Sequence, residues 1–270
     1  EKAKAKADLE RLLPRYLSGC RWFGGKAHPI RSARIVEAIA VSRATIVTFV
    51  QVEYTAGEAQ TYLLPVTCSP YHERRGRGAA GGPGEPDGRW SRDVIARVRL
   101  HKKDAVEEGL VCDATHTEDL AHVLLEVIRR RRQLKGTKGT LTSSSTRALR
   151  GVRGGVDGPL PPRVLTGEQS TTSIIYGDRM ILKLFRRLEA GTNPDLEIGR
   201  FLTEKQAFAH IPPMAGAIEY RQGQGEPVTV AMLQGFIPNQ GDAWRYTLDA
   251  LEGYYERARA QPQGALEGVA

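Results

Sequence analysis

One lysine of the chain lies inside a short apolar segment that has the alternation of a β-strand. Lys183 is the centre of the sequence Ile-Leu-Lys-Leu-Phe, and alternation places it on the same face as Ile181 and Phe185. A charged lysine on such a face is costly unless a partner or ligand neutralises it. This setting favours a lysine that binds an anion such as a phosphate. The alternative is a surface lysine on an edge strand with solvated acids nearby.

The segment before this strand is rich in small and hydroxylated residues. Backbone N–H groups in such a loop can approach phosphate oxygens closely, and serine and threonine hydroxyls add donors. The loop is not a Walker A motif, because no Gly-Lys-Ser/Thr ends it, and it is not the Gly-x-Gly-x-x-Gly loop of protein kinases. A tight turn at Gly177-Asp178 leads from it into the strand of Lys183. The candidate phosphate-binding residues of the loop are Gly167, Gln169, Ser170, Thr171 and Ser173.

A kinase places a glutamate of the next helix beside such a lysine and so directs it toward the phosphates. A helix is expected from Asp195 to His210, because acidic residues favour a first helical turn. Glu197 lies near its start and is the candidate partner of Lys183. Glu204, two turns later on the same helix, is its rival.

A strand exit further along the chain could contact the base of a nucleotide. The sequence Met-Leu-Gln-Gly-Phe-Ile-Pro-Asn begins at Met232 and is typical of a strand followed by a glycine-containing connector. In a bilobed kinase the hinge contacts adenine through backbone groups at this position. Gln234, Gly235 and Phe236 are therefore the candidate hinge residues, and an ordinary strand exit is the alternative.

The elements that must position these residues divide into two parts, and the first should hold an antiparallel sheet. Its strands are expected at residues 33–41, 44–54, 60–67 and 94–98, where β-branched and aromatic residues gather. A short helix over 8–17, interrupted at Pro14, and an amphipathic helix over 117–134 should accompany them. Residues 69–89 are mostly Gly, Pro, Arg and acid, so we expect a mobile surface loop there.

The second part follows a stretch rich in Gly, Ser and Thr at residues 135–160, which reads as a linker. Beyond it we expect a strand pair around Gly177-Asp178 and the helix that starts at Asp195. Two more strands, at 216–220 and 228–234, and a closing helix over 243–258 complete the chain. The boundary near residue 155 predicts two domains, 1–154 and 155–270.

Composition limits the class of protein. The 270 residues are 40% hydrophobic and 26% charged, which suits a globular core. The net charge is +8, but the excess is scattered apart from short clusters at 74–77 and 129–132. No aromatic-rich strand accompanies either cluster, so we expect phosphate-bearing small molecules rather than nucleic acid as partners. An RNA-binding protein is the weakest alternative.

Cysteine usage and hydropathy indicate the cellular compartment of the protein. The three cysteines (Cys20, Cys68, Cys112) are widely spaced and indicate neither a disulfide framework nor a zinc site. No run of 18 apolar residues predicts a membrane span, and the charged stretch 1–17 lacks a signal core. We therefore expect a cytoplasmic protein with no membrane partner. Because the chain begins at Glu1 without an initiator Met, we expect it to be part of a longer protein.

Together these segments resemble the bacterial maltokinase family, including the maltokinase part of trehalose synthase–maltokinase fusions. The resemblance begins at Arg21-Trp22-Phe23-Gly24-Gly25-Lys26 and continues with Gly167-Glu168-Gln169-Ser170 and Ser173. It then follows residues 181–188, 193–202 and 233–244. The ordered series is more specific than any one motif, and it extends over the chain outside residues 69–89.

The resemblance implies an α+β protein. An N-terminal cap domain of antiparallel sheet with helices would precede the N-lobe of an aminoglycoside-phosphotransferase-like, protein-kinase-like fold, with the start of the C-lobe. The implied activity is MgATP-dependent phosphorylation of maltose to maltose 1-phosphate, for α-glucan (glycogen) synthesis from trehalose. Lys183 would hold the ATP phosphates, Glu197 would orient it, residues 167–173 would cover the phosphates and residues 234–236 would form the hinge. ATP and Mg²⁺ would be the cofactors, and trehalose synthase a fused or associated partner.

Two departures from the family pattern accompany the resemblance. Thr171 stands in the loop where an asparagine is expected. The family's catalytic loop, with an aspartate base after a His-Gly pair, has no counterpart, so catalytic residues, metal ligands and most of the maltose site are expected beyond Ala270. None of the six histidines is followed by Gly-Asp: His28, His72, His101, His116, His122 and His210.

The chain alone should therefore be inactive, because phosphoryl transfer needs in-line positioning by both lobes. Two alternatives remain beside a maltokinase. One is a related sugar or aminosugar kinase, and the other is a non-catalytic module that binds trehalose synthase.

Overall fold

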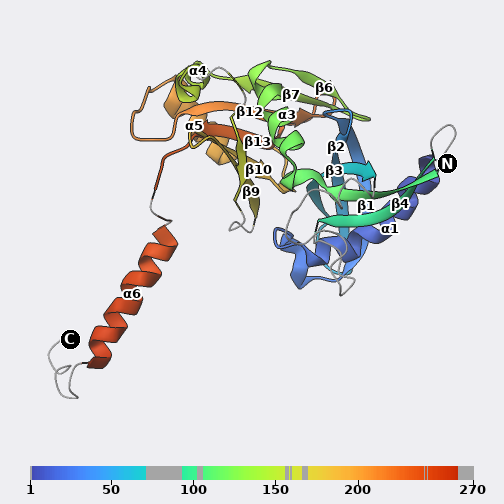
Figure 1. Ribbon diagram of the computed structural model, residues 1–270, viewed down its shortest axis with the longest axis horizontal. Helices are drawn as coiled ribbons and strands as arrows, with labels where there is room; N and C mark the ends of the chain where they lie inside the picture. Colours follow the sequence, from blue (N-terminus) through green and yellow to red (C-terminus); the bar gives the residue numbers. More distant parts are fainter. Residues whose placement is uncertain are drawn as a thin grey trace. The chain divides into compact units, whose positions relative to one another are not determined.

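The computed structural model describes residues 2–70, 93–101, 106–155, 158, 160–165, 170–239, 241 and 243–260. These residues form a mixed α+β structure with antiparallel sheets, so the predicted fold class is confirmed (Figure 1). Glu1–Phe236 form one compact unit and Ile237–Ala270 form a second. Gly167, Gln169 and most of the expected mobile loop, residues 71–89, lie outside the described residues.

The first sheet is built mainly from the N-terminal part of the chain. Its strand order is β1-β2-β3-β5-β4, and the short β11 also pairs with β3. The four predicted strands are present, whereas β5 was missed because its acidic first half hides the alternation. Ser69 and Pro70, expected in the loop, pair with β5 as the end of β3. The strands are β1 (Ile30–Ala40), β2 (Thr45–Tyr54), β3 (Gln60–Pro70), β4 (Val94–His101), β5 (Val106–Asp113) and β11 (Arg187–Leu188).

Helix α1 (Lys2–Gly19) covers one face of this sheet. Leu13 and Leu17 are buried against Val50 and Tyr62 of the sheet. The helix was expected to be interrupted at Pro14, but it continues through that residue. A short 3-10 turn, η1 (Gly24–Ala27), follows α1, and a second, η2 (Ala114–His116), follows β5.

The second sheet contains the strand of Lys183. Its order is β6-β7-β12-β13-β10-β9-β8, and every pairing is antiparallel. The turn between β9 and β10 has positive φ at both central residues, Gly177 (52°) and Asp178 (51°), as a type I′ turn requires. The strands are β6 (Gln133–Lys135), β7 (Thr140–Ser145), β8 (Pro162–Val164), β9 (Thr171–Tyr176), β10 (Met180–Phe185), β12 (Met214–Arg221) and β13 (Val228–Gly235).

Helices cover both faces of the second sheet. Helix α3 (Glu118–Arg129) and helix α4 (Ala148–Arg153) pack on one face, and helix α5 (Pro194–Glu204) packs on the other. Thr117 is the N-cap of helix α3, and its hydroxyl accepts a hydrogen bond from the amide of Leu120. It ends at Arg129 rather than at 134, because Arg131 has a positive φ of 49° and the chain turns into β6.

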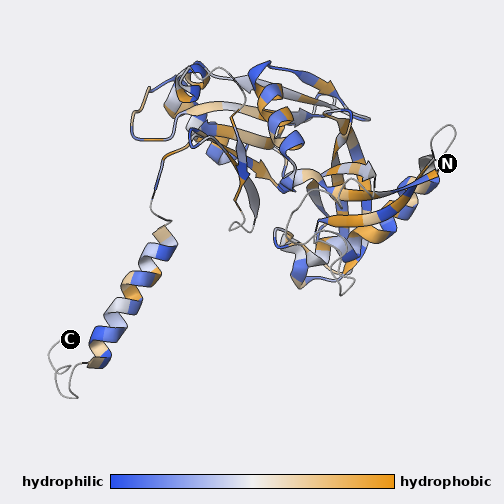
Figure 2. Ribbon diagram, in the orientation of Figure 1, coloured by the Kyte–Doolittle hydropathy of each residue, from blue (hydrophilic) through white to orange (hydrophobic). Residues whose placement is uncertain are grey.

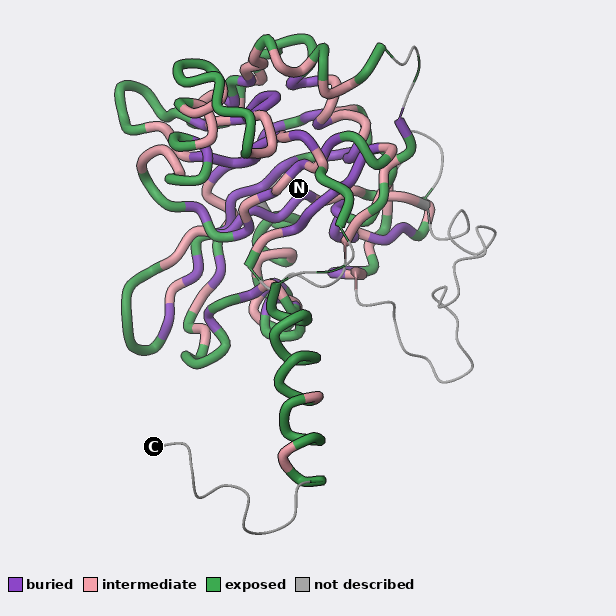
Figure 3. Tube along the Cα trace, turned by 90° about the vertical axis from the view of Figure 1, so that its left-hand side faces the viewer, coloured by how far each residue is buried: buried purple, intermediate pink, exposed green. Residues whose placement is uncertain are grey.

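A continuous core joins the two sheets. Residues of β2 such as Phe49, of α3 such as Leu124, and of β10 such as Leu182 belong to one buried cluster. Figure 2 shows apolar residues along the strands of both sheets, and Figure 3 shows buried residues at the centre of this unit. The prediction of a linker at 135–160 is wrong for β7 and α4. Strand β7 is part of the second sheet, and α4 packs against it. The domain boundary after residue 154 stays a prediction.

The second unit contains helix α6 (Ala243–Ala260), close to the predicted range. Its side chains are exposed along almost the whole helix (Figure 3). Large apolar side chains are among them, with Trp244 71% and Tyr255 62% exposed.

Candidate functional site

The candidate site lies on the face of the second sheet that α5 covers. Lys183 of β10 pairs with Ser173 of β9 on one side and with Met232 of β13 on the other. Residues that pair directly in an antiparallel sheet project from the same face. One row across the sheet therefore presents a hydroxyl, an ammonium group and a thioether, with Ala217 of β12 next in line.

Alternation along β10 confirms the predicted orientation of the lysine. Met180, Leu182 and Leu184 point into the core shared with α3 and are at most 1% exposed. Lys183 projects from the opposite face, where its side chain is 30% exposed. The ammonium group is therefore held on a largely apolar face and still reaches solvent.

The acidic partner of Lys183 in the structure is Asp195. Nζ of Lys183 lies 3.8 Å from Oδ2 of Asp195, which is 63% exposed. Glu197 and Glu204 are exposed on the same helix, and in the described part of the chain no ion pair joins either one to Lys183. Asp195 was predicted only as a residue of the first helical turn. The role of Glu197 stays a prediction.

Local sequence fixes where α5 begins. The side chain of Asn193 accepts a hydrogen bond of 2.9 Å from the amide of Asp195, and Pro194 occupies the first helical turn. Leu196 is fully buried against Met214 and Met232 of the sheet. This cap and this one apolar anchor place Asp195 beside the strand of Lys183.

The loop residues are only partly described. Ser170 is exposed, Thr171 begins β9, and Ser173 is fully buried within it. The structure thus places Ser173 beside Lys183, whereas Ser170 and Thr171 lie toward the start of the strand. Gly167 and Gln169 are not among the described residues.

The predicted hinge lies at the end of β13. Gln234 pairs with Ile181, so the segment directly continues the sheet that carries Lys183. The amide of Gly235 donates to the carbonyl of Pro213 at 2.9 Å, and that of Phe236 donates to the carbonyl of Arg179 at 2.8 Å. Because these two N–H groups are already used, a base at this position would have to bind through other backbone groups.

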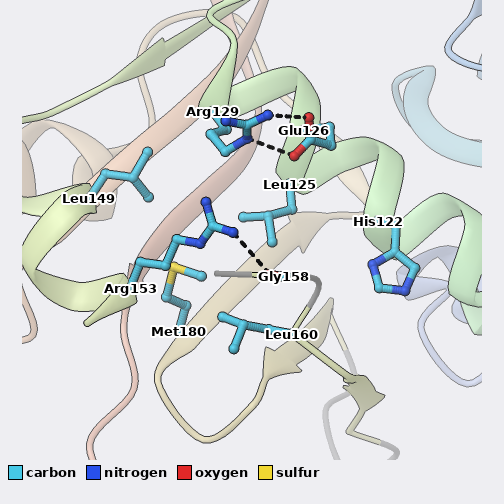
Figure 4. A pocket seen from close by; sticks show the side chains of 9 residues that line it. All are labelled: His122, Leu125, Glu126, Arg129, Leu149, Arg153, Gly158, Leu160 and Met180. Carbon is cyan, nitrogen blue, oxygen red and sulfur yellow. Dashed lines mark hydrogen bonds and ion pairs between the residues drawn. The ribbon is translucent and has the colours of Figure 1, made fainter. Parts of the chain in front are cut away.

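A cavity of about 500 Å³ lies on the opposite face of the sheet, between α3 and α4 (Figure 4). Its charged side chains are paired within the protein: Arg129 with Glu126, and Arg153 with the carbonyl of Gly158. The cavity is not part of the Lys183 face, because Met180 points into it. Its lining residues are His122, Leu125, Glu126, Arg129, Leu149, Arg153, Gly158, Leu160 and Met180.

Sequence reasoning missed two buried charges that join the sheets. Glu37 of β1 is 2% exposed, and its carboxylate accepts hydrogen bonds from Tyr220 and from the turn between β6 and β7. Arg186 is 1% exposed and pairs with Asp113. Strand alternation could have indicated that both are buried. Glu37 lies two residues from Ile35 and from Ile39, and Arg186 follows Leu182 and Leu184 at the same spacing of two.

The described residues contain neither a metal-binding cluster nor a membrane-spanning helix. No group of three or more His, Cys, Asp or Glu side chains in this part of the chain could hold a metal ion. No helix among the same residues is long and apolar enough to cross a membrane.

Comparison with protein families finds a match for the segment that contains most of the first sheet. Residues 16–116 match the model of the maltokinase N-terminal cap domain. This segment is similar to a maltokinase cap domain. It includes β1 to β5 and η2, together with the end of α1, and it confirms the predicted resemblance for this part of the chain.

Three solved structures of glucosamine kinase are also similar to the chain. The first, a complex with glucosamine, ADP and inorganic phosphate, has a TM-score of 0.47 at 15% identity and matches 87% of this chain. Crystal forms A and B have TM-scores of 0.45 and 0.44, both at 16% identity and over 80% of this chain. The chain spans 43%, 37% and 38% of the lengths of these structures.

Proposed function

We propose that this chain is the cap domain and nucleotide-binding lobe of a kinase that transfers the γ-phosphate of ATP to maltose, giving maltose 1-phosphate. The observation that carries the proposal is the setting of Lys183. It is a cation on a largely apolar sheet face, next to a serine and in reach of an acid on the following helix. The cap domain in the same chain supports maltose as the acceptor.

The described residues fit a nucleotide on this face. Lys183 would bind the phosphates through Nζ, and Asp195 would hold that ammonium group in place between turnovers. Met232 and Ala217, in the same row, are buried with Leu196 of α5 and would support the strand of Lys183 from beneath that helix. Residues 167–173 would cover the phosphates, residues 234–236 would form the hinge, and Glu197 remains a proposed second acid on α5. ATP supplies the phosphoryl group, and the protein's part is to hold it in line for transfer.

Several parts of the proposal concern the whole protein. The 270-residue chain would not turn over alone, because no His-Gly-Asp catalytic loop occurs in it. Mg²⁺ would accompany ATP, but we assign it no ligands among the described residues. A cytoplasmic location, α-glucan synthesis from trehalose, and association with trehalose synthase follow from the maltokinase resemblance and belong to this proposal.

The test is an acceptor panel with the full-length protein. Maltose, glucose, glucosamine and trehalose are each incubated with ATP, and transfer of the γ-phosphate is measured. Maltose should be the preferred acceptor. A preference for an aminosugar would make the aminosugar, not maltose, the substrate of the proposed kinase.

Lys183→Ala should lower the rate of transfer at least about a hundredfold, the scale of losing a transition-state charge contact. Lys205→Ala, which removes an exposed lysine at the end of α5, is the matched control. An unchanged rate in Lys183→Ala would refute the assignment.

A further inference from the structure

The strand that carries Lys183 passes from one sheet to the other at a single residue. β10 pairs with β9 and β13 of the second sheet, whereas β11 pairs with Thr61 and Tyr62 of the first. Arg186 stands between them, and its carbonyl accepts a hydrogen bond of 2.7 Å from the amide of Leu63. The strand of Lys183 therefore leads through Arg186 directly into β11, which belongs to the first sheet.

The side chain of Arg186 is bound on both sides of this crossing. Nε donates to Oγ1 of Thr172 on β9 at 2.9 Å. Nη2 lies 3.2 Å from Oδ2 of Asp113, at the end of β5, and also donates to Oγ1 of Thr115. All four side chains are buried. A planar guanidinium can make these contacts at once, which an ammonium group cannot.

Two aromatic residues of the cap region complete the cluster. The guanidinium carbon of Arg186 lies 4.4 Å from the centroid of the Trp22 ring, within range of a cation–π contact. The hydroxyl of Tyr16 donates to Oδ2 of Asp113 at 3.2 Å. Burial, with the nearby Asp113 charge, raises the pKa of Tyr16, so its hydroxyl stays a donor. The cap segment thus supplies the counter-charge and the aromatic contact for Arg186.

We propose that Arg186 is a positioning residue through which the cap domain fixes Lys183 for nucleotide binding. The guanidinium of Arg186 links the paired strands β9 and β10 close to the row of Lys183. Arg186 follows Lys183 by three residues, and its partner Thr172 directly precedes Ser173. Loosening this contact would let β9 and β10 shift relative to the cap. A displacement of about 1 Å at a reacting group can cost about a hundredfold in rate. The inference rests on the proposed function.

Glu37 offers a control for a purely structural role. It is a second buried charge between the sheets, and it accepts hydrogen bonds from Lys138 and Gly139 at 2.9 Å and from Tyr220 at 2.6 Å. These partners belong to the turn after β6 and to β12, not to β9 or β10. Glu37→Gln should therefore weaken the contact between the sheets and leave the strand of Lys183 in place.

The experiment compares Arg186→Lys, Thr172→Val and Glu37→Gln in the full-length protein, measuring KM for ATP, kcat and Tm. We expect the first two variants to raise KM for ATP about tenfold or more at temperatures well below their Tm. Glu37→Gln should lower Tm without changing KM for ATP. If Arg186→Lys does not fold, Thr172→Val, which removes one hydroxyl, carries the test.

An unchanged KM for ATP in the folded variants of Arg186 and Thr172 would overturn the inference. An equal rise in KM in Glu37→Gln would overturn it as well, because the effect would then follow stability alone. Lys183→Ala in the same assay separates this failure from that of the proposed function. If Lys183→Ala keeps full activity, the proposed function fails; if it is inactive and the positioning variants bind ATP normally, only the inference fails.

Discussion

The buried carboxylate of Glu37 should make the stability of this chain depend on pH in the acid range. Burial by itself raises the pKa of this group, but hydrogen bonds from Thr137, Tyr220 and the amides of Ala38 and Lys138 outweigh it and lower the pKa to about 2, from an ordinary 4.5. Because the folded-state pKa is below the unfolded-state value, the stabilisation is fully present above about pH 4.5. It is lost as the pH falls toward 2.

The size of the effect follows from the shift. A difference of about 2.5 pKa units corresponds to about 3 kcal/mol in the free energy of unfolding, at about 1.4 kcal/mol per unit. Glu37→Gln removes the titration. The variant should be less stable at pH 7, because an amide cannot accept from all of these donors, and it should lose about 3 kcal/mol less than the wild type between pH 6 and pH 2.

Urea unfolding of the 270-residue chain at a series of pH values measures this difference. Glu58→Gln, at an exposed position in the turn after β2, is the matched control and should keep the wild-type pH dependence. If Glu37→Gln and the wild type lose the same stability between pH 6 and pH 2, Glu37 is not the buried, hydrogen-bonded carboxylate described here.

Two further predictions concern helix α5. Asp195→Asn should lower kcat/KM for ATP about tenfold in the full-length protein, whereas Glu197→Gln should have little effect, because Asp195 forms the ion pair with Lys183. The reverse order of the two effects would assign the role to Glu197. Leu196→Ala should destabilise the chain by about 2–5 kcal/mol in urea unfolding, since Leu196 is fully buried. Ile198→Ala, at a side chain 58% exposed, should change stability by less than about 0.5 kcal/mol, and equal losses would show that α5 is not anchored as described.

Strand alternation carried most of what could be predicted of the fold. The segments with a clear apolar period, such as β2 and α3, were placed within a few residues. Strand β7 was missed because its sequence Thr-Leu-Thr-Ser-Ser-Ser resembles a linker, and only its pairing with β12 makes it a strand. Helix α3 was predicted to be too long because arginines favour helices. In the structure the backbone turns at Arg131, which has a positive φ.

The candidate site was predictable where it depends on one strand and not where it depends on tertiary contacts. The orientation of Lys183 follows from the period of β10. Its pairing with Asp195 instead of Glu197 depends on where Asn193 and Leu196 anchor α5, which spacing alone does not determine. Arg186 occupies a core position of the same alternation, but its partner Asp113 is 73 residues away in the sequence.

The central claim, that ATP phosphates bind beside Lys183, can be tested by chemical labelling. An ATP analogue with a reactive acyl group on its terminal phosphate acylates the lysine nearest to that phosphate, and mass spectrometry of the full-length protein identifies the residue. We predict acylation of Lys183 that excess ATP suppresses. Suppressible labelling of another lysine, with Lys183 unmodified, would contradict the account and move the nucleotide site elsewhere.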